Sequence, residues 1–266
     1  MKILFLTSGA HVPSTRFRVL QFVPKLRAAG HRCTVAHSFP EKYDFFPLFG
    51  WRLSQQLKRA TRSWHLLRAR LGRYDVVWIE REIFNDASSD FEERFRKTAP
   101  LCVLDVDDGV FLNFPEKFQR ICRMSDLVFA GNRYLKEYIE PQNPNILLVP
   151  TCVDTDAYRP RPATEQNARP VVGWIGTTGN LQYLAVAASA LSRLAAKLDF
   201  QLRLIAPEDG PIADLPLDGV DVRYLRWNPA TEIDEIRRFD VGIMPLRMDQ
   251  EWDKYKCGLK LLQYMA

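Results

Sequence analysis

The sequence predicts an α/β protein with two Rossmann-like halves, and three observations support this. Short apolar segments alternate with longer amphipathic segments along the whole chain, which is typical of βα units around parallel sheets. About six apolar segments precede residue 150 and about four follow residue 170. Between them, Pro160, Pro162 and Pro170 mark an exposed connection. We therefore expect a doubly wound domain at 1–150, a linker at 151–170 and a second domain at 171–266.

Charge is divided unevenly between the halves. The chain has 266 residues and a formal net charge of +5. Residues 1–150 hold 23 Lys or Arg against 16 Asp or Glu, a net +7, whereas residues 151–266 hold 14 against 16, a net −2. The basic half suits anionic lipid, nucleic acid or a phosphorylated acceptor. Because no recognisable nucleic-acid module accompanies it, we expect no nucleic-acid partner.

Cysteine usage and hydropathy bound the location of the protein. The five cysteines are scattered and form no CxxC, which indicates reduced thiols and excludes a zinc site of the usual spacing. No apolar run is long enough to span a bilayer. The apolar run within Met1–Ala10 is too short for a signal peptide and predicts a first strand. We expect a cytoplasmic protein.

The chain opens as a Rossmann-like unit does, with a strand at Lys2–Thr7, a loop containing Gly9, and a helix at Arg16–Ala29. A GxGxxG dinucleotide fingerprint is absent. Arg16 and Arg18 lie where the loop meets the helix. They are candidates to contact an anionic acceptor or donor phosphates, and ordinary surface arginines are the alternative.

A long basic helix is predicted at Trp51–Gly72, after a second strand at His31–Ala36. Its apolar residues form one stripe at helical spacing: Leu53, Leu57, Ala60, Trp64, Leu67 and Leu71. No acidic residue occurs from Trp51 to Arg73. We expect the stripe to pack on the sheet and the arginines to be solvated. The alternative is peripheral contact of the basic helix 51–73 with an anionic membrane, on the inner face of the cell membrane.

Charged residues follow the next strand, Tyr74–Ile79, as Glu80, Arg81 and Glu82. The carboxyl ends of parallel strands are where α/β proteins bind ligands. These residues are therefore candidates for an acceptor site, with a local salt-bridge network as the alternative.

Three aspartates, Asp105, Asp107 and Asp108, follow the strand Leu101–Leu104. Clustered carboxylates can hold a metal ion. The Asp-x-Asp pattern alone is a weak indication, and we expect no metal site.

The remaining elements complete both halves. In the first half we expect strands at Leu127–Ala130 and Ile146–Val149, and a helix at Arg133–Ile139 capped by Asn132. In the second half we expect a helix at Leu181–Leu198 and four strands: Val171–Gly176, Gln201–Ala206, Val220–Leu225 and Asp240–Pro245. Because a doubly wound domain normally has about six strands, the pattern predicts a second domain truncated at Ala266.

The last segment, Asp253–Ala266, reads as a glycine turn at Gly258 followed by a helix. Lys254, Lys256 and Lys260 cluster around the helix start. A helix N-terminus with nearby lysines favours a pyrophosphate site. A surface helix with a solvated basic end is the alternative.

Five segments, in order, resemble GT-B glycosyltransferases of the family 4 (glycosyltransferase group 1) type: PSTRFR, DVDDG, VPTCVDTDAY, GWIG and KCGLKLLQYMA. The resemblance implies two Rossmann-like domains facing across a cleft. It also implies retaining transfer of a sugar from a nucleotide-sugar to a glycan, lipid-linked or other acceptor, in cell-surface polysaccharide or glycoconjugate synthesis. The nucleotide-sugar is a cosubstrate, and no metal or other cofactor is implied.

Residue roles follow from this resemblance. Lys256 and Lys260 would stabilise the leaving diphosphate. Glu82 is a further catalytic candidate from its position after a strand, because the histidine that the family has at this strand end is absent here. The donor would be bound by Gly176, Thr177, Trp227, Arg247, Tyr255, Gly258, Leu259 and Gln263, with Gln263 on the ribose and Trp227 on the base. The acceptor side would comprise Gly9, Arg16, Arg18, Glu80 and Arg81.

Two departures from the family pattern keep other functions open. Tyr255 and Gln263 occupy the positions of the family's two acidic residues. A sugar-nucleotide-binding or scaffold protein that has lost catalysis is one alternative, and a sugar-nucleotide epimerase of the same fold is another. For Trp227, a tryptophan packed in the core is the alternative to a base-stacking residue.

Overall fold

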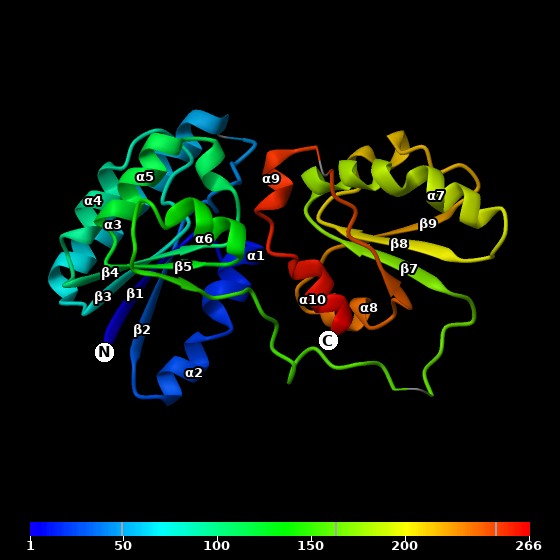
Figure 1. Ribbon diagram of the computed structural model, residues 1–266, viewed down its shortest axis with the longest axis horizontal. Coiled ribbons are helices and arrows are strands. Elements are labelled where there is room, and N and C mark those ends of the chain that lie inside the picture. Colours follow the sequence, from blue (N-terminus) through cyan, green and yellow to red (C-terminus); the bar gives the residue numbers. More distant parts are fainter. Residues whose placement is uncertain (49, 163, 248) are drawn as a thin grey trace. The chain divides into compact units, whose positions relative to one another are not determined.

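The computed structural model describes residues 1–266 except 49, 163 and 248, and it leaves the side chain of residue 211 undescribed. The described chain forms two compact units (Figure 1). Unit 1 comprises Met1–Thr151 and Lys254–Cys257, and unit 2 comprises Cys152–Asp253 and Gly258–Ala266.

These units differ from the predicted division at two places. Lys254–Cys257 pack with unit 1, although the prediction assigns them to the second domain. Residues from Cys152 onward group with unit 2, whereas the prediction sets 151–170 apart as a linker. Residue 163, inside that linker, lies outside the described residues.

Unit 1 is built on a parallel sheet with the strand order β2-β1-β3-β4-β5-β6. The strands are β1 (Lys2–Thr7), β2 (Arg32–His37), β3 (Val76–Glu80), β4 (Leu101–Val106), β5 (Leu127–Ala130) and β6 (Ile146–Leu148). β1, β3 and β4 are almost continuously buried because helices cover both of their faces.

Alternate side chains of this sheet enter two separate cores. One core joins the sheet to α3 (Gly50–Gly72), α4 (Asp90–Arg96), α5 (Pro115–Met124) and α6 (Arg133–Ile139). The other joins it to η1 (Arg16–Leu20) and α2 (Val23–Ala28). Two short elements complete unit 1, α1 (Pro13–Thr15) and η2 (Val110–Leu112).

The predicted helix Arg16–Ala29 is broken. α1 runs into the π-type turn η1, and α2 then begins at Val23 with Pro24 in its first turn. Proline lacks the backbone N–H that an interior helical position needs, whereas the first turn does not use it. Pro24 therefore starts a new helix rather than kinking one.

Unit 2 is built on a smaller parallel sheet with the strand order β10-β7-β8-β9. The strands are β7 (Val171–Ile175), β8 (Gln201–Ala206), β9 (Asp221–Arg226) and β10 (Val241–Gly242). Its helical elements are η3 (Thr178–Leu184), α7 (Ala185–Ala195), η4 (Gly210–Asp214), α8 (Glu232–Ile236), α9 (Glu251–Lys254), whose last residue belongs to unit 1, and α10 (Leu259–Met265). The two described sheets thus have the six and four strands that the pattern predicts.

Two glycines of this sheet allow aromatic rings to pack directly against its backbone. A Cβ on Gly173 would lie 2.0 Å from the Phe239 ring, and one on Gly242 would lie 2.2 Å from the ring of Tyr264. Tyr264 belongs to α10, and its hydroxyl accepts from the Ile175 amide at 3.1 Å. Glycine is therefore what lets α10 pack closely on β7 and β10.

The orientation predicted for the long basic helix is wrong. The structure confirms a helix, α3, but buries Ser54, Lys58, Arg62, Leu66 and Ala69. The predicted apolar stripe, which we expected on the sheet, is largely exposed instead. The polar side chains can be buried because they have hydrogen-bond partners among backbone carbonyls.

No helix in the described part of the chain has both the length and the apolar character needed to cross a membrane.

Candidate functional site

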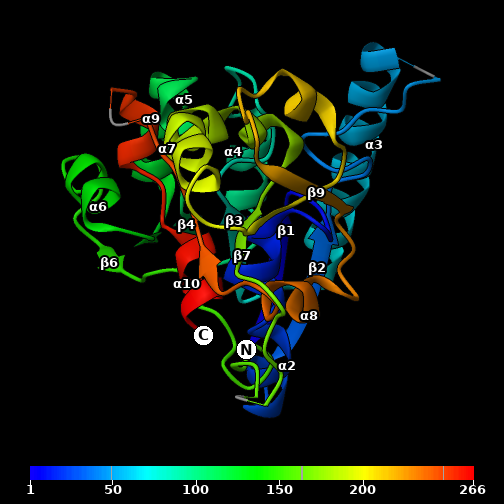
Figure 2. The same cartoon turned by 90° about the vertical axis from the view of Figure 1, so that its right-hand side faces the viewer.

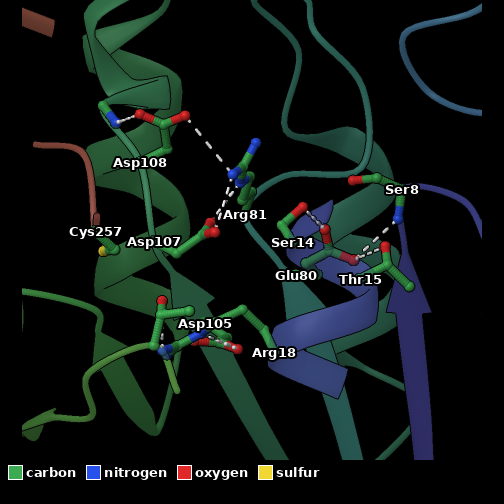
Figure 3. Close-up of polar contacts among 12 residues, drawn as sticks. Ser8, Ser14, Thr15, Arg18, Glu80, Arg81, Asp105, Asp107, Asp108 and Cys257 are labelled. Atoms are coloured by element: carbon green, nitrogen blue, oxygen red, sulfur yellow. Dashed lines mark hydrogen bonds and ion pairs between the residues drawn. The ribbon is translucent and has the colours of Figure 1, made fainter. Parts of the chain in front are cut away.

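The carboxyl ends of the unit 1 strands gather a polar cluster at a topological switch point. The chain pairs β1 with β2 on one side and with β3 on the other. Open α/β sheets bind ligands outside the strand ends at such a point. Ser8 and Gly9 follow β1 here. Glu80 is the last residue of β3 and Arg81 follows it; Ser8, Glu80 and Arg81 are labelled in Figure 3.

Glu80 holds the loop after β1 in place. It is 1% exposed and accepts hydrogen bonds from Ser14 Oγ, Thr15 Oγ1 and the Ser8 amide, the last at 3.1 Å. The carboxylate predicted on the acceptor side is thus satisfied within the protein. The buried Ser8 hydroxyl has no hydrogen-bond partner among the described residues.

Arg81 stands beside Glu80 in the left-handed backbone region, with φ 59°. Its Nη2 donates to Asp107 Oδ2 at 3.0 Å and lies 3.7 Å from Asp108 Oδ2 (Figure 3). Burial would raise the pKa of Asp107, but the ion pair with Arg81 outweighs it and holds that pKa below its usual value. Burial raises the pKa of Asp108.

Arg18 links two strand ends inside unit 1. Its Nε lies 3.1 Å from Asp105 Oδ1, and its Nη1 donates to the Val149 carbonyl at 2.6 Å. Burial raises the pKa of Asp105 to about 6, against the opposing effect of Arg18. The predicted acceptor-side residue Arg18 is therefore buried, while the half-buried Arg16 lies with its guanidinium 5.2 Å from the Phe17 ring centroid.

Glu82, predicted to be catalytic, is buried between two lysines. Its Oε1 lies 3.2 Å from Lys42 Nζ, and its Oε2 lies 3.2 Å from Lys117 Nζ. Gly9 is covered by the Glu41 side chain, because a Cβ on Gly9 would lie 2.5 Å from Glu41 Cδ.

The three aspartates after β4 face different arginines. Asp105 pairs with Arg18, whereas Asp107 and Asp108 face Arg81. Within the described residues, no group of three or more His, Cys, Asp or Glu side chains is arranged to hold a metal ion.

The segment Lys254–Cys257 is fastened to unit 1. The Tyr255 ring is buried, meets the Phe111 ring edge-on at 4.7 Å between centroids, and its carbonyl accepts from Asn132 Nδ2 at 2.8 Å. Lys256 is near enough to Asp108 to oppose the rise in that residue's pKa. Tyr255, predicted at the donor sugar, thus contributes its ring to the core of unit 1.

Unit 2 has a switch point of its own, between β7 and β10. Lys260, near the start of α10, lies across the carboxyl end of β7. Its Cε is 3.0 Å from the place of a Cβ on Gly176, and its Nζ is 5.8 Å from the Trp174 ring centroid. Gly176 leaves room for this approach, and the next residue, Thr177, is exposed at the start of η3. Lys260, predicted at the start of the last helix as a diphosphate ligand, thus also lies at a strand end of this half.

The turn before α10 is held by Asp253. Its buried carboxylate accepts from Tyr183 Oη at 2.9 Å and from the Arg247 amide at 2.7 Å. Gly258 adopts a left-handed conformation, φ 64°, where the chain enters α10. The Arg247 side chain is exposed and Leu259 is half-buried.

Trp227 and Gln263 meet at a buried carboxylate. Glu232 accepts from Trp227 Nε1 at 2.6 Å, from Tyr158 Oη at 2.7 Å and from Gln263 Nε2 at 3.1 Å. Gln263 Nε2 also donates to Tyr158 Oη at 3.0 Å. The predicted base- and ribose-binding residues are therefore neighbours, tied together through Glu232.

Several residues of these networks escape sequence reasoning. Tyr158 lies 74 positions from Glu232 in the chain, and Gln263 lies 31 positions from it, so no local pattern connects them. Only Ser14 and Thr15 could have been suspected from the sequence. They follow the first strand, and Glu80, their acceptor, ends the third strand, so both lie at the carboxyl ends of neighbouring strands.

No protein-family model and no curated protein sequence matches the chain. Solved structures do match. An alpha-glucosyltransferase in complex with UDP matches with TM-score 0.64 and 12% identity, over 99% of this chain and 77% of that one. The OtsA apo structure matches with TM-score 0.61 and 13% identity, over 93% and 79%. A glycosyltransferase from Rickettsia africae ESF-5 matches with TM-score 0.59 and 15% identity, over 91% and 72%.

Another alpha-glucosyltransferase structure contains UDP-glucose and DNA. These ligands belong to that protein. At such low identity the likeness shows the fold alone: this chain has the α/β fold of the GT-B glycosyltransferases, with two units of parallel sheet.

Proposed function

We propose that the protein is a glycosyltransferase that takes a sugar from a nucleotide-sugar donor. The observation that carries this proposal is the position of Lys260 across the end of β7, at the switch point of unit 2. A cation beside a strand end and an exposed threonine suits a diphosphate. Solved proteins of the same fold are named as glucosyltransferases with UDP or UDP-glucose bound.

Lys260 acts on the leaving group in this proposal. Breaking the bond between sugar and diphosphate places negative charge on the diphosphate, and a fixed ammonium stabilises that charge more in the transition state than in the ground state. The hydroxyl and amide of Thr177 are further donors for phosphate oxygens. A role for Lys256 stays a prediction, since that residue packs with unit 1. The proposal invokes no metal ion.

On unit 1, the proposal assigns the acceptor to the strand-end cluster. Arg81 is held there by Asp107, and the Ser8 hydroxyl has no partner among the described residues. Both are donors for the oxygens of a hydroxylated acceptor. Retention of anomeric configuration and a glycan or lipid-linked acceptor are supported by the motif resemblance.

The test is turnover of a panel of UDP-, GDP- and ADP-sugars, followed as release of nucleoside diphosphate. Lys260→Ala should lower kcat by about 100-fold, the usual cost of losing one donor that stabilises transition-state charge. Lys197→Ala, an exposed lysine after α7, removes the same charge from the same unit and should leave kcat unchanged. Equal turnover of Lys260→Ala and wild type would refute the role of Lys260. Proton NMR of the first-formed product tests retention.

A second candidate is a protein that binds a sugar-nucleotide without turning it over. The positions of Tyr255 and Gln263 favour this candidate. The Tyr255 ring is packed in the core of unit 1, and the Gln263 side-chain amide donates to Tyr158 and Glu232 inside unit 2. Tight binding of an intact nucleotide-sugar, with no diphosphate release in the presence of any acceptor, would decide for this candidate.

A further inference from the structure

Helix α3 is built with its polar side toward the protein. Lys58 Nζ donates to the carbonyls of Lys42 and Asp44, each at 2.7 Å. Arg62 donates to the carbonyl of Ala36 at 2.8 Å and to that of Thr7 at 2.6 Å. Ser54, Leu66 and Ala69 complete the buried row. The inward face of a long amphipathic helix is thus largely occupied by charged and hydroxyl groups.

The apolar stripe of α3 faces outward as a consequence. Trp64 is 58% exposed, Leu67 48% and Leu71 76%. At 100° per residue, these side chains lie opposite Lys58 and Arg62. Phe39, Tyr43, Phe45, Leu48 and Trp51, in the loop and first turn before the stripe, are exposed as well. A soluble protein rarely exposes so many large apolar side chains in one region without a partner for them.

Exposed arginines border this stripe. By helical spacing, Arg52, Arg59 and Arg70 lie along one edge and Arg68 along the other. No acidic residue occurs between Trp51 and Arg73, so α3 itself carries a net positive charge. Arg59 pairs with Asp86 at 2.7 Å. Glu41 and Asp44 lie in the loop before α3, so the positive charge is concentrated along the helix. In Figure 2, the N-terminal end of α3 extends beyond the strands of the sheet that the helix covers.

We propose that α3 and the preceding loop dock on the surface of an anionic phospholipid bilayer. The stripe enters the boundary between headgroups and acyl chains, where tryptophan is favoured, and the arginines bind lipid phosphates. A second copy of the chain fits this surface less well, because the arginines of the two copies would face and repel each other. Duplex DNA is poorer too, because its phosphates would meet leucine and tryptophan at the centre of the surface. This docking goes beyond the proposed sugar transfer.

Vesicle co-sedimentation tests the docking. The chain is mixed with vesicles of phosphatidylcholine alone, or of phosphatidylcholine with phosphatidylglycerol, at low and at high salt. The wild-type protein should pellet with the anionic vesicles, and high salt should weaken its binding. Trp64→Glu with Leu67→Glu should weaken binding by about tenfold or more. Leu198→Glu, an exposed apolar residue of unit 2, is the matched control and should bind as the wild type does.

Charge is tested separately. Arg68→Gln with Arg70→Gln should reduce binding to anionic vesicles by about tenfold. Arg94→Gln with Lys97→Gln removes the same charge from exposed positions on and after α4, and should have little effect. Circular dichroism melts of every variant verify that it is folded.

Three results would overturn the proposal. The first is no pelleting of the folded wild-type protein with anionic vesicles. The second is equal pelleting of wild type and the Trp64→Glu, Leu67→Glu variant. The third is a concentration-dependent dimer, or a complex with duplex DNA, that this variant abolishes while vesicle binding persists. None of these experiments contains a nucleotide, so their failure is separate from failure of the proposed sugar transfer.

Discussion

Arg81 shows how much the arrangement at the strand ends of unit 1 depends on single residues. It adopts a left-handed backbone conformation, which costs a residue other than glycine about 1–3 kcal/mol. The ion pair with Asp107 holds the guanidinium over the end of β3. The sequence identifies Arg81 and its position after a strand, but not its partner, because Asp107 belongs to a different strand end.

Asp107→Asn should therefore destabilise the fold. The substitution removes the charge opposite a largely buried guanidinium, and breaking such a pair costs roughly 3 kcal/mol. Urea denaturation at neutral pH measures the change. Glu137→Gln breaks the exposed pair with Arg133 and should cost less than about 1 kcal/mol. Equal losses in the two variants would contradict the buried role of Asp107.

His65 makes the stability of unit 1 depend on pH. Burial, together with the nearby Arg62 and Arg68, lowers its pKa from 6.5 to about 4. The unfolded chain therefore binds a proton between these values that the folded chain does not, so stability falls as the pH is lowered through this window.

His65→Leu should flatten that dependence. Between pH 7 and pH 5, the variant should lose roughly 1–2 kcal/mol less free energy of unfolding than the wild type. Urea denaturation at the two pH values gives both differences. Parallel pH profiles of wild type and variant would show that His65 does not titrate on unfolding.

At the scale of elements, α3 separates what periodicity can predict from what it cannot. The spacing of apolar residues predicts a helix at Trp51–Gly72, and the structure has one at Gly50–Gly72. The spacing does not reveal which face is buried, because Arg62 finds its acceptors on β1 and β2, far away in the sequence. Burial of polar groups is decided by such partners rather than by hydropathy.

Arg62→Leu tests this reversed packing. The change removes two hydrogen bonds to strand-end carbonyls in a fully buried place, so we expect a loss of about 2–4 kcal/mol in free energy of unfolding. Arg70→Leu, on the exposed side of the same helix, should change stability by less than about 0.5 kcal/mol. A thermal or urea melt in which Arg62→Leu matches the wild type would contradict the burial of Arg62.

The strands were easier to predict than the helices around them. A continuous apolar run such as VVGWI marks a buried parallel strand, and the sheet described in unit 2 has the four strands that the sequence predicts. The sequence predicts one helix at Arg16–Ala29, whereas a new helix, α2, begins at Val23, because Pro24 suits the first turn of a helix. The family resemblance predicts Tyr255 at the donor, whereas its ring packs on Phe111 and Tyr138.

At the scale of the whole molecule, the two units divide the chemistry. Unit 1 carries the strand-end cluster around Arg81 and the exposed surface of α3, whereas unit 2 carries Lys260 at its switch point. The last segment of the chain belongs to both, since Lys254–Cys257 pack with unit 1 and Gly258–Ala266 with unit 2. The order of elements in the sequence does not predict that Lys254–Cys257 return to unit 1, because this depends on the packing of the Tyr255 ring.

The central claim is that unit 2 binds the diphosphate of a nucleotide at Lys260. Isothermal titration of the chain with UDP, GDP and ADP tests it most directly. We predict that one nucleotide binds, that Lys260→Ala weakens this binding by about tenfold or more, and that Lys197→Ala does not. If the folded protein binds none of the three, or if Lys260→Ala binds as tightly as the wild type, the assignment of the donor site to Lys260 is wrong.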